Sequence, residues 1–261
     1  MKKTVQAIAM LMALALVVSF AGCATAKTDT RLAAIKKAGK LILGTSADYP
    51  PYEFHTQIDG KDAIVGFDVA IAREIAADLG VTLEIKDMDF DGLLAALASG
   101  NVDLVIAGMT PNEERRQNVD FSDLYYYAEH GVLIRKADES KYAAAVESLK
   151  DAMVGAQREA AGEPHAQVKE LGKLPDLIME LKNSKIEAVV AELPVAKAYL
   201  GANADLMLAS YTFKDSDGGS AVAAKKGETA LVAEINKTIA RLLSEGKIDT
   251  FVSEASEAVE Y

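Results

Sequence analysis

The spacing of apolar residues divides the chain into alternating strands and helices. Apolar positions that run together or alternate predict strands over 40–46, 81–88 and 102–109. Apolar positions at helical spacing predict helices over 66–80, 91–100 and 228–246, and a glycine ends each of them. This alternation predicts an α/β fold with a largely parallel sheet.

One unit of helix, turn and strand occurs twice along the chain. Residues 92–110 align without gaps with residues 176–194, which lie 84 positions further on, and the strand LILGTS at 41–46 has a counterpart in AMVGAQ at 152–157. The matched order predicts two similar lobes. Because ligands of open α/β sheets bind outside the carboxyl ends of the strands, we expect the binding site at Thr45–Ser46, Gly108–Thr110, Ala156–Gln157 and Ala191–Glu192.

The N-terminal residues are typical of an export signal. Two lysines precede the apolar run 7–22, which at 16 residues is shorter than the ~20 residues of a membrane-spanning helix. Cys23, the only cysteine, follows at once in a sequence that resembles the end of a bacterial lipoprotein signal. We therefore expect 1–22 to be a signal peptide and Cys23 to be lipidated and anchored at the cell membrane. Cleavage near Ala26, which would release a free periplasmic protein, is the alternative.

Composition excludes several classes of function. The formal net charge is −11, and loss of residues 1–22 removes two lysines and no acid, which makes it −13. Such a surface repels nucleic acid. Asp87, Asp89 and Asp91 match the first half of a calcium loop, but Ala98 stands where a bidentate glutamate is required. We therefore expect no metal and no cofactor. The three histidines lie apart from any serine or cysteine nucleophile, so the sequence does not support a catalytic triad.

Thr110, Pro111 and Glu113 are spaced as a capping box and predict a helix that begins at Thr110. A helix N-terminus preceded by Gly108 and followed one turn later by an arginine suits a carboxylate, which a guanidinium can hold with two parallel hydrogen bonds. Spacing alone leaves open whether Arg115 or Arg116 faces inward.

A second set of residues could bind the ammonium group and the side chain of an amino acid. Glu192 ends the equivalent strand of the second unit, where its carboxylate could pair with an ammonium group. Tyr49 follows a strand end beside two prolines, and Phe67 begins a helix, so their rings could enclose an apolar or flat cationic side chain. One lobe that holds a carboxylate and another that holds an amine describe an α-amino acid.

The segments YPPYEF, GFDVAIAREIA, GMTPNEERRQNVDFS and AVVAELPVA resemble the polar amino-acid branch of the bacterial extracellular solute-binding proteins, the receptors of ABC importers. The resemblance implies the type II periplasmic-binding-protein fold, with two α/β lobes, each a mostly parallel sheet flanked by helices, joined by two crossover hinge strands. It also implies a monomer that closes on an α-amino acid, with a polar or cationic one favoured, and delivers it to the permease subunits. The corresponding boundaries are a linker over 23–39, a first lobe formed by 40–126 and 219–261, and a second lobe over 127–218.

The resemblance also assigns roles to individual residues. It implies ring contacts from Tyr49 and Phe67, backbone and hydroxyl contacts from Gly108, Met109 and Thr110, a carboxylate contact from Arg115, an amine contact from Glu192 and a further contact from Gln157.

The chain departs from the family at three positions. Glu192 replaces a shorter aspartate, Glu159–Ala160 replace a Gly-Thr or Gly-Ser turn, and Ser46 replaces the acid of many members that bind cationic side chains. A cyclohexadienyl dehydratase on the same scaffold, with Glu192 as a general acid, is the alternative function.

Overall fold

The computed structural model describes residues 30–157, 167–214 and 218–259. The predicted signal peptide, Cys23, the cleavage site near Ala26 and the Glu159–Ala160 turn lie outside these ranges. Within them, no helix combines the length and apolar character that a membrane crossing requires.

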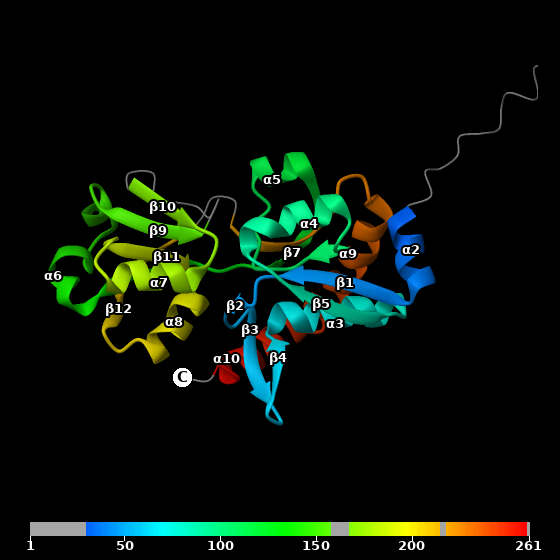
Figure 1. Cartoon of the computed structure of the whole chain (residues 1–261), viewed down its shortest axis with the longest axis horizontal. Helices are drawn as coiled ribbons and strands as arrows, with labels where there is room; N and C mark the ends of the chain where they lie inside the picture. Colours follow the sequence, from blue (N-terminus) through cyan, green and yellow to red (C-terminus); the bar gives the residue numbers. More distant parts are fainter. Residues whose placement is uncertain (1–29, 158–166, 215–217, 260–261) are drawn as a thin grey trace, which may run out of the picture.

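The first lobe contains a five-stranded sheet in the order β5-β1-β6-β13-β7 (Figure 1). β1 is parallel to β5 and β6, whereas β13 is antiparallel to both of its neighbours. The strands are β1 (Lys40–Thr45), β5 (Thr82–Asp87), β6 (Leu104–Val105), β7 (Val119–Tyr126) and β13 (Ser220–Lys225). The helices of this lobe are α2 (Thr30–Ala38), α3 (Phe67–Leu79), α4 (Leu93–Ser99), α5 (Glu113–Asn118), α9 (Thr229–Ser244) and α10 (Lys247–Glu257).

The second lobe repeats this arrangement, with the strand order β10-β9-β11-β8-β12 and β8 as the single reversed strand. Its strands are β8 (His130–Arg135), β9 (Met153–Gln157), β10 (Gln167–Leu171), β11 (Ala188–Glu192) and β12 (Leu206–Phe213). Its helices are α6 (Glu139–Tyr142), α7 (Leu174–Lys182) and α8 (Leu193–Ala202). The short 3-10 turns among the described residues of both lobes are η2 (Phe90–Gly92), η3 (Lys136–Asp138) and η4 (Val146–Leu149).

The repeated unit seen in the sequence corresponds to equivalent positions in the two sheets. β1 and β9 are second in their sheets, and β6 and β11 are third. The chain passes between the sheets at 127–129 and again after β12. The predicted two-lobed α/β fold is therefore confirmed, although residues 127–129 are an irregular connection rather than part of a continuous hinge strand.

Several predicted elements are also confirmed. Leu231, Ile235, Ile239 and Leu242 of α9 are all at most 1% exposed, as the helical spacing predicted. Gly80 and Gly100 end α3 and α4 in the left-handed conformation. Within the predicted linker, α2 is a helix that buries Ile35 in the core. Of the predicted strand 102–109, only Leu104–Val105 form β6, although Ile106 N still donates to the carbonyl of Gly44 in β1.

A small antiparallel sheet projects from the first lobe (Figure 1). It consists of β2 (Asp48–Tyr49), β3 (Glu53–Ile58) and β4 (Lys61–Val65). Its first strand follows β1 directly, so the sheet places Asp48 and Tyr49 beside the carboxyl end of β1.

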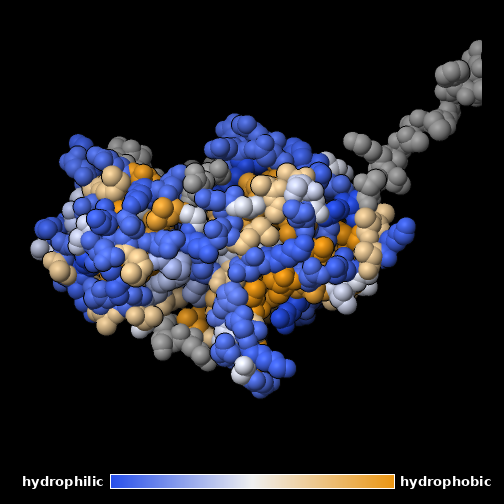
Figure 2. Space-filling view, in the orientation of Figure 1, coloured by the Kyte–Doolittle hydropathy of each residue, from blue (hydrophilic) through white to orange (hydrophobic). Residues whose placement is uncertain are grey.

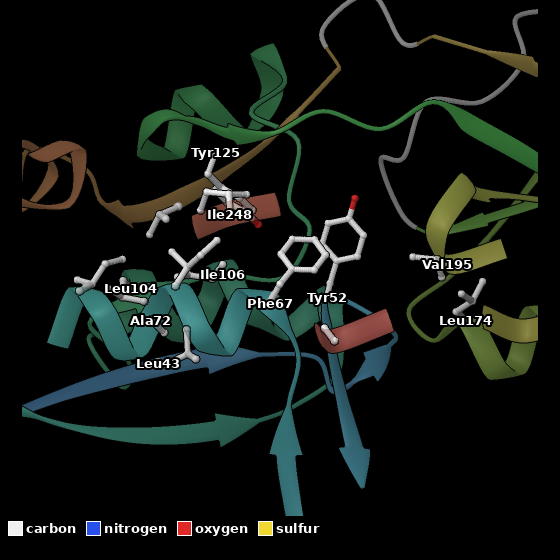
Figure 3. Close-up of a cluster of buried hydrophobic side chains, with 14 of the residues drawn as sticks. Leu43, Tyr52, Phe67, Ala72, Leu104, Ile106, Tyr125, Leu174, Val195 and Ile248 are labelled. Carbon is white, nitrogen blue, oxygen red and sulfur yellow. The ribbon is translucent and has the colours of Figure 1, made fainter. Parts of the chain in front are cut away.

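Residues of both lobes belong to one buried apolar cluster. In Figure 3, Tyr52 and Phe67 of the first lobe lie side by side, and Leu174 and Val195 of the second lobe lie across from Tyr52. In the view of Figure 2 the second lobe is mostly hydrophilic, whereas the first lobe also shows a hydrophobic area over β1, β5 and α3.

Candidate functional site

The carboxyl ends of the strands of the two sheets face each other. The backbone N–H of Glu192, at the end of β11, donates to the hydroxyl of Tyr49 in the other lobe at 3.4 Å. Tyr49 in turn lies against Gly108, which follows β6. The structure therefore brings Tyr49, Gly108 and Glu192 together, as predicted from strand ends.

Gly108 occupies a position that disfavours any residue with a side chain. Its φ of +56° lies in the left-handed region, and an added Cβ would stand 3.3 Å from both Tyr49 Cε1 and Tyr52 Cδ1. Its N–H donates to Asp68 Oδ2 at 2.7 Å, and the same oxygen accepts from the Tyr125 hydroxyl at 2.9 Å. Burial raises the pKa of Asp68 to about 7. The buried carboxyl thus fixes the backbone of the strand end.

The helix after Gly108 begins later than predicted. α5 starts at Glu113, and its cap is Asn112, whose Oδ1 accepts from Arg115 N at 2.8 Å. The capping box of Thr110, Pro111 and Glu113 was therefore wrong, because the nearer amide side chain satisfies the free N–H group. With only six residues, α5 contributes a short helix start, and an anion would depend mainly on the arginine side chain.

Arg115 is the arginine that faces inward. It is 3% exposed, its Nη1 donates to the carbonyl of Thr110 at 2.9 Å, and its guanidinium carbon lies 5.2 Å from the centre of the Phe90 ring. Arg116 is exposed and donates from Nε to the carbonyl of Pro111. The choice that spacing left open is thus decided by burial.

Phe67 does not present its ring to the site. It is fully buried, with ring centres 4.2 Å from Tyr52 and 5.1 Å from Tyr126 (Figure 3). Its predicted role as a ring contact is not supported, because the start of α3 turns the side chain into the core. The half-buried Phe90, beside Arg115, is a better second ring to accompany Tyr49. Its position three residues after the end of β5, close to another strand end, was the signal in the sequence.

Met109 and Thr110 continue the strand end in different ways. Met109 is 1% exposed and packs in the core of the first lobe, and its carbonyl accepts from Ala221 N. Only its backbone can contribute to a site. Thr110 is half-buried, and its carbonyl holds Arg115.

Two predicted site residues of the second lobe each have a buried side-chain atom without a hydrogen-bond partner among the described residues. They are Oε2 of Glu192 and Nε2 of Gln157, in residues that are 6% and 8% exposed. Burial raises the pKa of Glu192 to about 8. A cationic group placed against Glu192 would favour its ionised form, as the predicted ammonium contact requires.

A further acid lies beside the predicted site. Asp48 Oδ1 accepts from the Ser46 hydroxyl at 3.2 Å, whereas Oδ2 is buried with no partner among the described residues. Burial raises the pKa of Asp48 to about 6. Its carbonyl accepts from the Tyr199 hydroxyl of α8 at 2.7 Å, so the second lobe covers it. Ser46 itself carries no charge, but it orients the carboxyl of Asp48.

The acids of the rejected calcium loop have other contacts. Asp87 accepts from Ala47 N, and Asp89 forms an ion pair with Lys173 of the second lobe, with 2.8 Å between Nζ and Oδ1. Among the described residues, no group of three or more potential ligands could hold a metal ion.

Comparison with known proteins agrees with this arrangement. Residues 41–254 match the bacterial extracellular solute-binding proteins, family 3. The arginine-binding extracellular protein ArtP of Bacillus subtilis is 36% identical over 92% of this chain and 94% of its own length. The glutamine-binding protein GlnH of the same species is 31% identical over 85% and 83%.

Solved structures show the same two-lobed fold. An amino acid ABC transporter substrate-binding protein from Streptococcus pneumoniae, bound to L-arginine, is 36% identical over 88% of this chain and all of its own, with a TM-score of 0.81. The holo form of ArgBP from T. maritima is 36% identical over 81% and 93%, with a TM-score of 0.72. The chain belongs to the bacterial extracellular solute-binding proteins, family 3.

Proposed function

We propose that this protein is the substrate-binding component of an amino-acid ABC importer, and that it binds an α-amino acid with a cationic side chain between its lobes. The observation that carries the proposal is a pair of buried ionisable side chains of opposite type, the guanidinium of Arg115 in the first lobe and the carboxyl group of Glu192 in the second. The guanidinium receives the ligand's carboxylate, and Glu192 receives its ammonium group. A ligand that joins both ends favours the closed state through contacts that an open state lacks.

The preference for a cationic side chain rests on Asp48 and on two rings. Asp48 stands next to Tyr49, and its Oδ2, which has no hydrogen-bond partner in the described part of the chain, can accept from a guanidinium or ammonium group. The rings of Tyr49 and Phe90 offer faces that attract a flat cation. The similarity to an arginine-binding relative and to a solved structure bound to L-arginine supports a cationic ligand over a neutral one.

The remaining parts of the proposal concern its place in the cell. The export signal over 1–22 would direct the chain out of the cytoplasm, and the lipidated Cys23 would anchor the receptor at the outer face of the cell membrane, with release near Ala26 as the alternative. We place the first lobe at 40–126 with 219–261 and the second at 127–218, and propose that the monomer passes its ligand to the permease subunits. The family and the named relatives favour a receptor over the dehydratase.

A binding screen tests the proposed function. Residues 27–261 would be titrated calorimetrically with each of the twenty amino acids, and with prephenate and arogenate under assay for turnover. We expect L-arginine to bind most tightly, L-lysine and L-histidine more weakly, and neither ring compound to be consumed. Absence of binding by every amino acid, or turnover of prephenate or arogenate, would contradict the proposal.

A further inference from the structure

One buried carboxyl oxygen joins three segments of the first lobe. Asp68, the second residue of α3, is fully buried, and its Oδ2 accepts hydrogen bonds from Gly108 N at 2.7 Å and from the Tyr125 hydroxyl at 2.9 Å. Gly108 belongs to the strand end that follows β6, and Tyr125 belongs to β7, which leads into the connection 127–129. Two donors on one oxygen hold the carboxyl group in one orientation. Because Asp68 has no exposed surface that a ligand could contact, it acts on the site only through these neighbours.

The backbone after Gly108 is anchored a second time. The carbonyl of Met109 accepts from Ala221 N of β13 at 3.0 Å. Because a trans peptide group directs its C=O and N–H in opposite directions, the N–H of Thr110 is turned away from β13. This N–H has no hydrogen-bond partner among the described residues, and neither has the carbonyl of Gly108. The two anchors therefore leave one donor and one acceptor of the strand end available to a ligand.

Arg115 depends on the same strand end. Its Nη1 donates to the carbonyl of Thr110 at 2.9 Å, and its backbone N–H donates to Asn112 Oδ1 at 2.8 Å. The guanidinium and the N–H of Thr110 therefore belong to one short segment, whose start is fixed at Gly108. A carboxylate bound by both donors requires them at defined positions, because hydrogen bonds weaken steeply as their geometry departs from the optimum.

We infer that Asp68, oriented by Tyr125, is a positioning residue for the half of the site that binds the carboxylate of the ligand. It fixes Gly108, and through this residue it places the N–H of Thr110 and the guanidinium of Arg115. The assignment rests on the proposed function, because it acts on the same site. It gives a role in ligand binding to a buried acid that no ligand touches.

Two substitutions of Asp68 and two ligands test the inference. In the mature chain, Asp68→Leu removes the acceptor at similar volume, whereas Asp68→Asn keeps an acceptor oxygen. We expect Asp68→Leu to weaken L-arginine binding, measured by calorimetry, roughly 10- to 100-fold. The same variant should bind agmatine, which is arginine without its carboxylate, within about twofold of wild type, because that ligand does not use the two donors. Asp68→Asn should retain most of the affinity for arginine.

Two buried tyrosines provide a matched pair of variants. Tyr125→Phe removes the hydroxyl that holds Asp68, and we expect it to weaken arginine binding roughly three- to tenfold. Tyr52 is equally buried and its ring also lies beside Gly108, but its hydroxyl has no hydrogen-bond partner among the described residues (Figure 3). Tyr52→Phe should therefore bind arginine within about twofold of wild type. Equal losses of affinity in the two variants would contradict the inference.

Hydrogen exchange of the Gly108 amide in the ligand-free, 15N-labelled protein provides a second readout. This amide should exchange roughly tenfold faster in Asp68→Leu than in wild type, and Asp68→Asn should restore its protection. Equal loss of affinity for arginine and agmatine, or an unchanged exchange rate at Gly108, would show a merely structural role and overturn the inference.

The same measurements separate this inference from the proposed function. Should wild type bind no amino acid, the proposed function would fail, and the exchange rate would still decide whether Asp68 fixes the strand end at Gly108. If Asp68→Leu does not fold, the comparison of Tyr125→Phe with Tyr52→Phe replaces it in both measurements. Weaker arginine binding and faster exchange are then expected in Tyr125→Phe alone.

Discussion

At the scale of single residues, the two neighbouring arginines of α5 have the same side chain but differ in burial and in contacts. Arg115 is buried between the Thr110 carbonyl and the Phe90 ring, whereas Arg116 is exposed. Arg115→Ala should weaken amino-acid binding at least 100-fold, because a buried bidentate contact to a carboxylate is lost. Arg116→Ala, measured by the same calorimetry, should bind within about twofold of wild type. Circular dichroism would verify that both variants fold, and equal affinities of the two would contradict the assignment of Arg115.

A second prediction at this scale concerns the contribution of the Asp48 charge to ligand binding. Asp48→Asn keeps the size of the side chain and removes its charge, so it should weaken L-arginine binding roughly tenfold. Citrulline, the neutral isostere of arginine, should bind the variant as well as it binds wild type. Asp62→Asn removes an exposed acid of the same lobe and serves as the control. A parallel loss for arginine and citrulline would mean that Asp48 supports the loop and not the ligand.

At the scale of elements, the strand end at Gly108 can be tested against another left-handed glycine. Gly108→Ala strains the backbone and brings a methyl group 3.3 Å from two tyrosine rings, whereas Gly60, at φ +72°, has nothing within 4 Å of an added Cβ. We expect Gly60→Ala to cost about 1 kcal/mol of unfolding free energy and Gly108→Ala about 2–4 kcal/mol. Chemical denaturation measures the unfolding free energy of both variants. Equal costs would show that the rings of Tyr49 and Tyr52 shift to make room for the added methyl group.

Elements were predictable where a single pattern determined them. Apolar spacing identified α3, α4 and α9, and the internal repetition identified the equivalent strands β6 and β11, because both depend on burial of one face. The cap at Asn112 was missed because Thr110 and Asn112 are both good capping residues, and only the path of the chain after β6 selects one. The prediction of Phe67 in place of Phe90 as a ring contact was wrong for a similar reason. Each ring stands at the entry to a helix, and the packing of the lobe decides which one points inward.

At the scale of the whole molecule, polar contacts join the lobes across the cleft. They include the Tyr199 hydroxyl on the Asp48 carbonyl and the Lys173–Asp89 ion pair. Because this contact joins the two lobes, Tyr199→Phe should weaken the closed state relative to an open one. The variant should therefore release bound arginine roughly fivefold faster, as measured by stopped-flow fluorescence.

Tyr211→Phe is the matched control for this closure experiment. The Tyr211 hydroxyl donates to the Tyr142 carbonyl within the second lobe, so its loss does not distinguish open from closed states. An unchanged release rate in Tyr199→Phe, or the same acceleration in both variants, would show that the Tyr199 contact does not stabilise the closed state.

Buried acids make the stability of the whole ligand-free molecule depend on pH. Burial raises the pKa of Glu192 to about 8 and that of Asp68 to about 7, and it raises the pKa of Glu53 well above its usual value. The folded chain therefore binds more protons than the unfolded chain between about pH 4 and pH 8, and its unfolding free energy falls as pH rises through this window. His55 acts in the same direction. Burial lowers the pKa of its imidazole, but the carboxylates of Asp87 and Asp62 raise it by more, so the net pKa is raised. Its contribution to the unfolding free energy is therefore lost as pH rises through the folded-state pKa.

The melting temperature of the ligand-free protein should accordingly be higher at pH 5.5 than at pH 8, by roughly 3–8 °C. Acids with lowered pKa values, such as Asp78 and Asp120, stay ionised throughout this range and do not oppose the trend. Glu192→Gln should reduce the slope, because an amide carries no proton to lose. Saturating arginine should reduce it in wild type as well, since the ammonium group stabilises the ionised carboxylate. Calorimetric melting at both pH values measures all three cases, and a melting temperature that rises toward pH 8 would show that these carboxyl groups are not protonated in the folded chain.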